Sequence, residues 1–178
     1  MRIDVPAINN EGIVDCFSVQ CMRFENGNGN CLVTGVVGNA IAEMVQVALS
    51  VIKSNYILLK IDKKIINEFD FHVHFTNGSI YKDGTSAGLG IFMSVMYSCL
   101  DENMRKYVEG KNILATGEID LYGNVLEVGG MKEKFSIFKE RQYDYFLVPK
   151  LTDLVIDDDR IIKVENVLDF IQILKKLK

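Results

Sequence analysis

The spacing of hydrophobic and polar residues predicts strands in the first half of the chain. Residues 69–76 alternate between apolar and polar side chains, which is the period of a strand with one buried face, and a turn at Asn77-Gly78 follows. The apolar runs 12–24 and 31–35 flank Asn26-Gly27-Asn28-Gly29, which is typical of a hairpin turn. We therefore expect an N-terminal β-hairpin made of these two runs.

Other segments have the period of helices. From Asn39 to Lys53 polar residues recur every three or four positions, which predicts an amphipathic helix. Residues 86–100 are apolar almost throughout and predict a buried helix, and the charged residues 101–111 continue it as a loop or extension. Further helices are expected from Gly129-Gly130 to about residue 141 and over 167–177, the last with Asn166 as its N-cap.

Short strands alternate with helices in the second half of the chain. Their residues are 113–119, 124–128, 144–148 with a stop at Pro149, and 161–164. This order predicts an α/β or α+β fold with a mixed sheet and flanking helices. No repeat or linker interrupts this order of elements, so we expect one domain over residues 1–178. Its 48% hydrophobic residues are enough to form a core.

Composition and charge exclude several classes of function. The net charge is −4 and adjacent basic residues occur only as isolated pairs, such as Lys175-Lys176, so we do not expect a nucleic-acid partner. The four cysteines include no C-x-x-C pair, which favours reduced thiols in a cytoplasmic protein. No export signal or membrane-spanning run is present, so we expect no membrane association.

Ser86 is the strongest candidate nucleophile. It lies in Asp83-Gly84-Thr85-Ser86-Ala87-Gly88, at the start of the expected apolar helix. A helix N-terminus favours the negative charge that develops on an attacking alkoxide and on an acyl-transfer oxyanion. The alternative interpretation is that Ser86 is an ordinary N-cap beside glycines that permit close packing.

The two histidines do not provide an ordinary base for Ser86. Gly84 to Gly88 matches G-x-S-x-G, but that motif requires a histidine after the serine, whereas His72 and His74 both precede it. An order of His74, Asp83 and Ser86 remains open and demands an unusual loop. A metal site on His72, His74 and Asp70 also remains open, although no third ligand with suitable spacing is evident for the histidines.

A lysine serves as base only where burial lowers its pKa, and one helix offers a candidate. In the helix after Gly130, Lys134 falls beside the apolar stripe of Met131, Phe135 and Phe138, whereas Lys132 falls on the polar side. Helix geometry therefore selects Lys134 as the buried amine. The alternative is that Lys134 lays its methylenes on the apolar face and extends its charge into water.

Three long motifs resemble the proteolytic domain of the Lon family. FHVHFTNGSIYKDGTSAG is similar to the family's H-V-H strand followed by K-D-G-P-S-A-G. ATGEIDLYGNVLEVGGMKEK is similar to T-G-E-I-x-L-x-G-x-V-L-x-I-G-G-L-K-E-K, and LVTGVVGNAIAEMVQVALSVIKS resembles the family's earlier L-T-G-x-L-G segment. The resemblance runs from about residue 12 to the C-terminus and implies the Lon protease fold.

The resemblance implies a serine endopeptidase with a Ser–Lys dyad that cleaves unfolded or extended proteins. Ser86 matches the nucleophile and Lys134 the second lysine of K-E-K. Thr116 matches a threonine near the lysine amine, and Asp83 matches the aspartate ahead of the serine, which either orders the loop or pairs with the lysine. The family also implies six-membered rings and ATP use by a separate ATPase region, with no cofactor in this domain.

The chain departs from the family pattern at two places. Thr85 stands where the motif has proline, and residues 101–111 look like a short insertion between the two dyad residues. ATPase regions do not accompany the domain, so we expect either an excised proteolytic domain or a stand-alone Lon-like protease. A non-catalytic Lon-like assembly or partner-binding module is the alternative, and the presence of both Ser86 and Lys134 argues against it.

Overall fold

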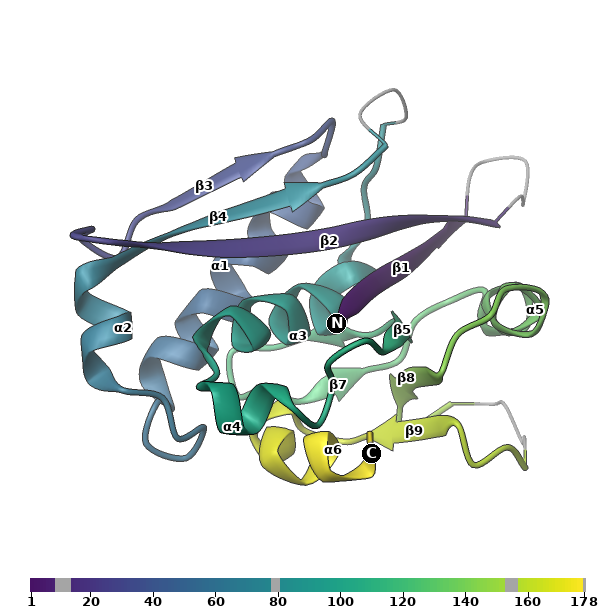
Figure 1. Ribbon diagram of the computed structural model, residues 1–178. Coiled ribbons are helices and arrows are strands. Elements are labelled where there is room, and N and C mark those ends of the chain that lie inside the picture. Colours follow the sequence, from purple (N-terminus) through teal and green to yellow (C-terminus); the bar gives the residue numbers. More distant parts are fainter. Residues whose placement is uncertain (9–13, 78–80, 153–156, 178) are drawn as a thin grey trace.

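A mixed β-sheet forms the centre of the computed structural model, which describes residues 1–8, 14–77, 81–152 and 157–177 (Figure 1). Within these ranges the sheet has seven strands in the order β3-β4-β2-β1-β5-β8-β9. Their bounds are β1 (Arg2–Ile8), β2 (Val14–Glu25), β3 (Cys31–Thr34), β4 (Phe69–Phe75), β5 (Asn112–Ala115), β8 (Tyr145–Pro149) and β9 (Ile161–Val164). β2 is antiparallel to β1 and β4, and the other neighbours are parallel. The expected mixed α/β class is confirmed.

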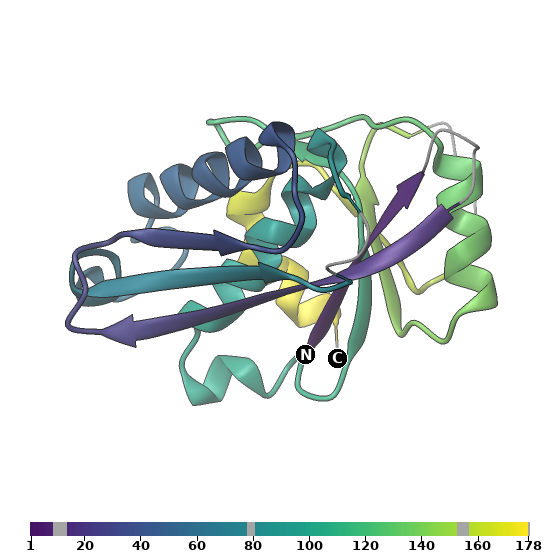
Figure 2. The same ribbon diagram turned by 90° about the horizontal axis from the view of Figure 1, so that it is seen from above.

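Helices cover both faces of this sheet (Figure 2). On one face α1 (Asn39–Ser54) packs on α3 (Gly88–Cys99), and α6 (Phe170–Lys176) joins them through Phe92 and Phe170. On the other face lies α5 (Met131–Glu140). The side chains of the short strand β5 point alternately to these two faces. Ile113 and Ala115 belong to the core under α3, while Leu114 packs with Phe138 of α5.

Smaller elements connect these layers. They are α2 (Lys63–Glu68), the 3₁₀ turn η1 (Thr85–Ala87), α4 (Glu102–Arg105), the two-stranded ribbon of β6 (Glu118–Ile119) and β7 (Val125–Leu126), and the 3₁₀ turn η2 (Val167–Asp169). The single strand expected at 113–119 is divided into β5 and β6, and the segment 101–111, expected as a loop or helix extension, contains the separate short helix α4. Asn166 caps η2 by accepting from the Leu168 amide, as its position predicts.

The three strongest sequence patterns are confirmed by the burial of their side chains. Along β4 buried and half-buried residues alternate, α1 buries one side, and α3 buries nearly every residue. The pattern failed at β1, a central strand with helices on both sides that buries four consecutive residues, among them Asp4. A charged residue at a buried position hides the strand from a count of apolar residues.

The hairpin expected around Asn26–Gly29 is wrong. Strand β4 lies between β2 and β3, because Phe71 of β4 pairs antiparallel with Arg23 and parallel with Cys31. The intervening segment wraps over the start of β4, where the Asp70 carboxylate accepts hydrogen bonds from the amides of Asn28 and Asn30. The N-terminal hairpin is instead β1 with β2, and its connecting residues 9–13 lie outside the described ranges, as does Gly78 of the expected Asn77-Gly78 turn.

Two further observations concern the cysteines and the helices. All four cysteines lie in described ranges and carry free thiols; Cys16 and Cys99 are buried and Cys21 and Cys31 are half-buried. Among the described helices, none combines the length and the apolar character that crossing a bilayer requires.

Candidate active site

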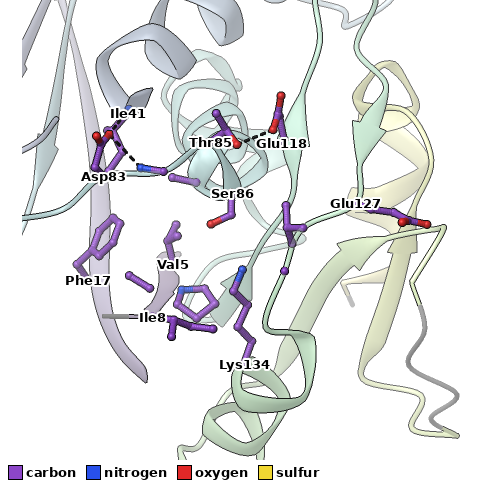
Figure 3. Close-up of a pocket in the computed structure, with 16 residues that line it drawn as sticks. Val5, Ile8, Phe17, Ile41, Asp83, Thr85, Ser86, Glu118, Glu127 and Lys134 are labelled. Carbon is purple, nitrogen blue, oxygen red and sulfur yellow. Dashed lines mark hydrogen bonds between the residues drawn. The ribbon is translucent and has the colours of Figure 1, made fainter. Parts of the chain in front are cut away.

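A cavity of about 420 Å³ opens where β1, the start of α3, β6 and the segment before α5 meet (Figure 3). Both faces of the domain contribute to it, because α3 and α5 lie on opposite sides of the sheet. Its walls are formed by Val5, Pro6, Ala7, Ile8, Phe17, Ile41, Asp83, Gly84, Thr85, Ser86, Ala87, Glu118, Glu127, Val128, Gly129 and Lys134. Three of the four predicted site residues, Ser86, Lys134 and Asp83, therefore line one cavity.

Ser86 lies in the η1 turn that leads into α3. Gly84 permits the turn with a φ of +124°, a backbone conformation that residues other than glycine rarely adopt. The Ser86 carbonyl accepts a hydrogen bond of 2.9 Å from the Gly117 amide, which fixes the turn against the β6 segment. The half-buried side chain of Ser86 faces the cavity from the side of α3 (Figure 3).

Lys134 enters the same cavity from α5, with its amine directed toward Ser86 (Figure 3). The residue is 3% exposed, whereas Lys132 is exposed on the outer side of the helix. The expected contrast between the two lysines is thus present, and Lys134 does not extend its charge into water. Burial lowers the pKa of Lys134 to about 8, and the nearby Glu133 carboxylate opposes the shift.

Thr116 connects the two predicted dyad residues. It is completely buried, accepts a hydrogen bond of 3.1 Å from Lys134 Nζ, and its hydroxyl donates to the Ser86 carbonyl at 3.4 Å. The hydroxyl therefore holds the amine in place and ties the lysine to the backbone of the serine turn. The resemblance placed Thr116 near the amine, and the geometry agrees.

Asp83 is directed toward α1 rather than toward the lysine. Its Oδ1 accepts from the Ile41 amide at 3.3 Å and from the Gly84 amide at 3.0 Å. The Ile41 contact supplies an acceptor at the N-terminus of α1, where no side chain of the preceding Gly38 can do so. Of the two roles expected for Asp83, the contacts correspond to ordering of the loop.

The histidine alternatives are not assembled in the structure. His72 Nε2 and His74 Nδ1 lie 2.7 and 2.8 Å from the Thr34 hydroxyl, on the outer side of β4, and neither lines the cavity. His74 is thus not placed as a base for Ser86. Asp70, the third residue of the metal alternative, holds the amides of Asn28 and Asn30, and the described ranges contain no group of three or more metal-binding side chains.

Two acidic residues of the cavity were not singled out from the sequence. Glu118 accepts a hydrogen bond from the Thr85 hydroxyl, and Glu127 is exposed at the rim. The signal for Glu118 was its place in Thr-Gly-Glu-Ile, two residues after Thr116. Glu127 had no signal, because an isolated carboxylate between apolar residues does not reveal which surface it lines.

The fold and the cavity together define a class of protein. It is a mixed α/β domain in which a serine at the start of a buried helix faces a buried lysine from the opposite side of the sheet. The two side chains are 48 residues apart in sequence, and Thr116 bonds to both residues.

Comparisons with known proteins identify the family within this class. Residues 12–174 match the Lon protease (S16) C-terminal proteolytic domain. The chain is 36% identical over 132 residues to the Lon protease of Karelsulcia muelleri, covering 74% of the chain and 15% of that protein. Identity is 37% over 136 residues to the Lon protease of Malacoplasma penetrans, covering 76% and 17% respectively.

The Lon protease of Clostridium acetobutylicum is 36% identical over 124 residues, which cover 70% of the chain and 15% of that protein. The chain belongs to the family of Lon protease C-terminal proteolytic domains. It spans about 15% of the length of the curated relatives it matches. The family agrees with the resemblance found in the sequence motifs and with the observed fold.

Proposed function

We propose that this chain is a serine endopeptidase domain in which Ser86 is the nucleophile and Lys134 the general base. The observation that carries the proposal is the buried Lys134 amine, whose pKa is lowered to about 8 and which shares a cavity with Ser86. A lysine with its ordinary pKa is almost entirely protonated near neutral pH and accepts no proton. Burial increases the neutral fraction, as a general base requires.

The proposed mechanism is acyl transfer. Neutral Lys134 takes the proton of Ser86 Oγ as the oxygen attacks the substrate carbonyl, which forms a tetrahedral oxyanion. Backbone N–H groups of the η1 turn stabilise that oxyanion. Lys134 then gives the proton to the departing amine, an acyl-serine remains, and water hydrolyses it with Lys134 again acting as base. Thr116 orients the amine through its hydrogen bond, and Asp83 orders the loop.

The proposed substrates are unfolded or extended protein segments. An extended peptide binds by adding its main chain to strand-like backbone beside the cavity, which suits segments without stable structure of their own. The Lon proteases that the chain matches support the protease assignment. We further propose that the domain acts in the cytoplasm, without a cofactor of its own and without nucleic-acid or membrane partners.

We also propose that ATP acts only through an ATPase domain outside residues 1–178, and that copies of the chain assemble into a six-membered ring. Family membership supports both points. Light scattering of the purified chain tests the ring: a hexamer agrees with it, and a monomer at every concentration contradicts it for the isolated domain.

The dyad is tested by cleavage of an unfolded protein, without ATP, using the parent chain, Ser86→Ala, Lys134→Ala and Lys132→Ala. The first two substitutions are expected to reduce the rate by about a thousandfold, and the exposed Lys132 is the matched control, expected within about twofold of the parent. Equal activity of parent and Ser86→Ala contradicts the proposal. If both are inactive although folded, ring contacts or the ATPase are required, or the non-catalytic alternative holds.

A further inference from the structure

Gly84, two residues before Ser86, does not pack closely against other elements. Gly84 has a positive φ, and a Cβ placed on it meets nothing within 4 Å. On the C-terminal side, α3 is buried from Ala87 onward and holds the turn firmly. On its N-terminal side, Ser86 is therefore positioned by the polar contacts of the residues just before it, in addition to the contacts that Gly117 and Thr116 make with its own carbonyl.

Thr85 makes one of these contacts. Its Oγ1 donates a hydrogen bond to Glu118 Oε2, and both side chains are half-buried at the wall of the cavity. A hydroxyl that donates to a carboxylate forms one of the stronger kinds of hydrogen bond, because the acceptor is charged. Figure 3 shows this bond directly beside Ser86.

Glu118 connects this contact to the element that leads to the lysine. It belongs to β6 and pairs with Leu126 of β7, and the chain continues from β7 through Gly129 and Gly130 into α5. The neighbouring Gly117 amide holds the Ser86 carbonyl. One short ribbon therefore contacts the serine turn and begins the path to Lys134.

We infer that Thr85 and Glu118 are a positioning pair that sets Ser86 Oγ relative to Lys134 Nζ. The inference rests on the proposed function, because it assigns the pair a role in that site. The matching family motif has proline at this position, which restricts φ without any hydrogen bond. In this chain the hydrogen bond from the Thr85 side chain to Glu118 restricts the backbone before Ser86, in place of the proline ring.

The test uses the parent chain with Thr85→Val, Thr85→Ser, Glu118→Gln and the double variant Thr85→Val/Glu118→Gln. Valine keeps the shape of threonine and removes the hydroxyl, while serine keeps the hydroxyl. Thr34→Val is the matched control, since it removes a threonine hydroxyl that bonds to the histidines of β4, away from the cavity. Peptidase kcat and KM are measured, together with hydrogen–deuterium exchange of the amides of residues 85–87.

We expect Thr85→Val to lower kcat about tenfold with little change in KM, because a misplaced nucleophile weakens the reaction more than substrate binding. Thr85→Ser is expected to restore kcat to within about threefold of the parent. The double variant is expected to be no worse than Thr85→Val alone, since Glu118→Gln weakens a contact that Thr85→Val already removes. Exchange at 85–87 accelerates in Thr85→Val and stays at the parent rate in Thr34→Val.

The two proposals fail in different ways. If Ser86→Ala abolishes cleavage while Thr85→Val matches the parent in kcat and in amide exchange, the positioning pair is wrong and the peptidase assignment stands. Additive losses in the double variant also overturn the pair. If the parent chain shows no cleavage, amide exchange alone decides whether the Thr85 hydroxyl orders the Ser86 turn.

Discussion

At the scale of single residues, the buried position of Lys134 controls the chemistry of the site. Thr116 is the hydrogen-bond partner of its amine, and no carboxylate within the described ranges forms an ion pair with it. Burial disfavours the ammonium form more than the nearby Glu133 carboxylate favours it, which is why the pKa falls. The proposed base therefore lowers the stability of the fold, because its charged form must be buried at neutral pH.

The lowered pKa predicts a specific dependence of rate on pH. Because only neutral Lys134 accepts the serine proton, kcat/KM should rise as pH increases through about 8 and level off above it. Initial rates on a fluorogenic peptide between about pH 6 and pH 10 measure this limb. A flat profile over that range, or a limb near pH 6 typical of histidine, argues against Lys134 as the base.

Much of the site could be predicted from the sequence at this scale. Ser86 is flanked by glycines and helix geometry selects Lys134, so both candidates followed from local sequence. The resemblance added Thr116 and Asp83. Glu118 and Glu127 were not found, because their relevance depends on which surfaces meet at the cavity, and sequence spacing does not specify that.

At the scale of elements, the start of α5 determines where Lys134 lies. Gly130 has a φ of +68° at the N-cap, and a Cβ there would collide with the Ile8 side chain of β1. Gly129 has open space around its Cβ position. The two adjacent glycines therefore differ. Gly130 is needed for its backbone conformation and its close approach to Ile8, whereas neither requirement applies to Gly129.

Gly130→Ala is expected to lower the free energy of unfolding by about 2 kcal/mol and to reduce peptidase activity more than tenfold, because alanine is strained at a φ of +68° and the Ile8 side chain must move aside. Gly129→Ala is the matched control and should change stability by less than about 0.5 kcal/mol. Urea denaturation followed by circular dichroism gives both values. Equal stability of the two variants contradicts the requirement for glycine at the positive φ of residue 130.

The element predictions succeeded where one helix or strand shows its own period, as in α1, α3 and β4. They failed where pairing depends on a distant segment. Asn26–Gly29 has the composition of a hairpin turn, yet Asp70 binds the backbone of this segment and places β4 between the two strands. Local turn composition favours reversal of the chain but does not select the strand that pairs.

At the scale of the whole molecule, burying the Lys134 charge reduces the stability of the fold. Below about pH 8 the amine is charged both in the folded and in the unfolded chain, so folding carries the full cost of burial. Between about 8 and the ordinary lysine value of 10.5 the folded amine is neutral while the unfolded one is still charged, so the cost decreases as pH rises. Stability should therefore increase across this interval.

Lys134→Met, which fills similar space without charge, is expected to raise the free energy of unfolding near neutral pH by about 2 kcal/mol while abolishing cleavage. The gain should shrink as pH rises toward 10.5 and approach zero above it, where the parent lysine is neutral in both states. Urea denaturation of the parent and the variant at two pH values measures it. A Lys134→Met variant less stable than the parent at neutral pH would show that the amine is not penalised by burial.

The sequence by itself determined the fold class, the principal helices, the serine turn and the family, because each depends on periodicity or on motifs that are continuous in the chain. Only the tertiary structure decided that Ser86 and Lys134 share a cavity, that β4 separates β2 from β3, and that Thr85 bonds to Glu118. These features join residues 30 or more positions apart. Such contacts depend on how the buried faces pack together, and packing is a property of the whole chain rather than of any segment.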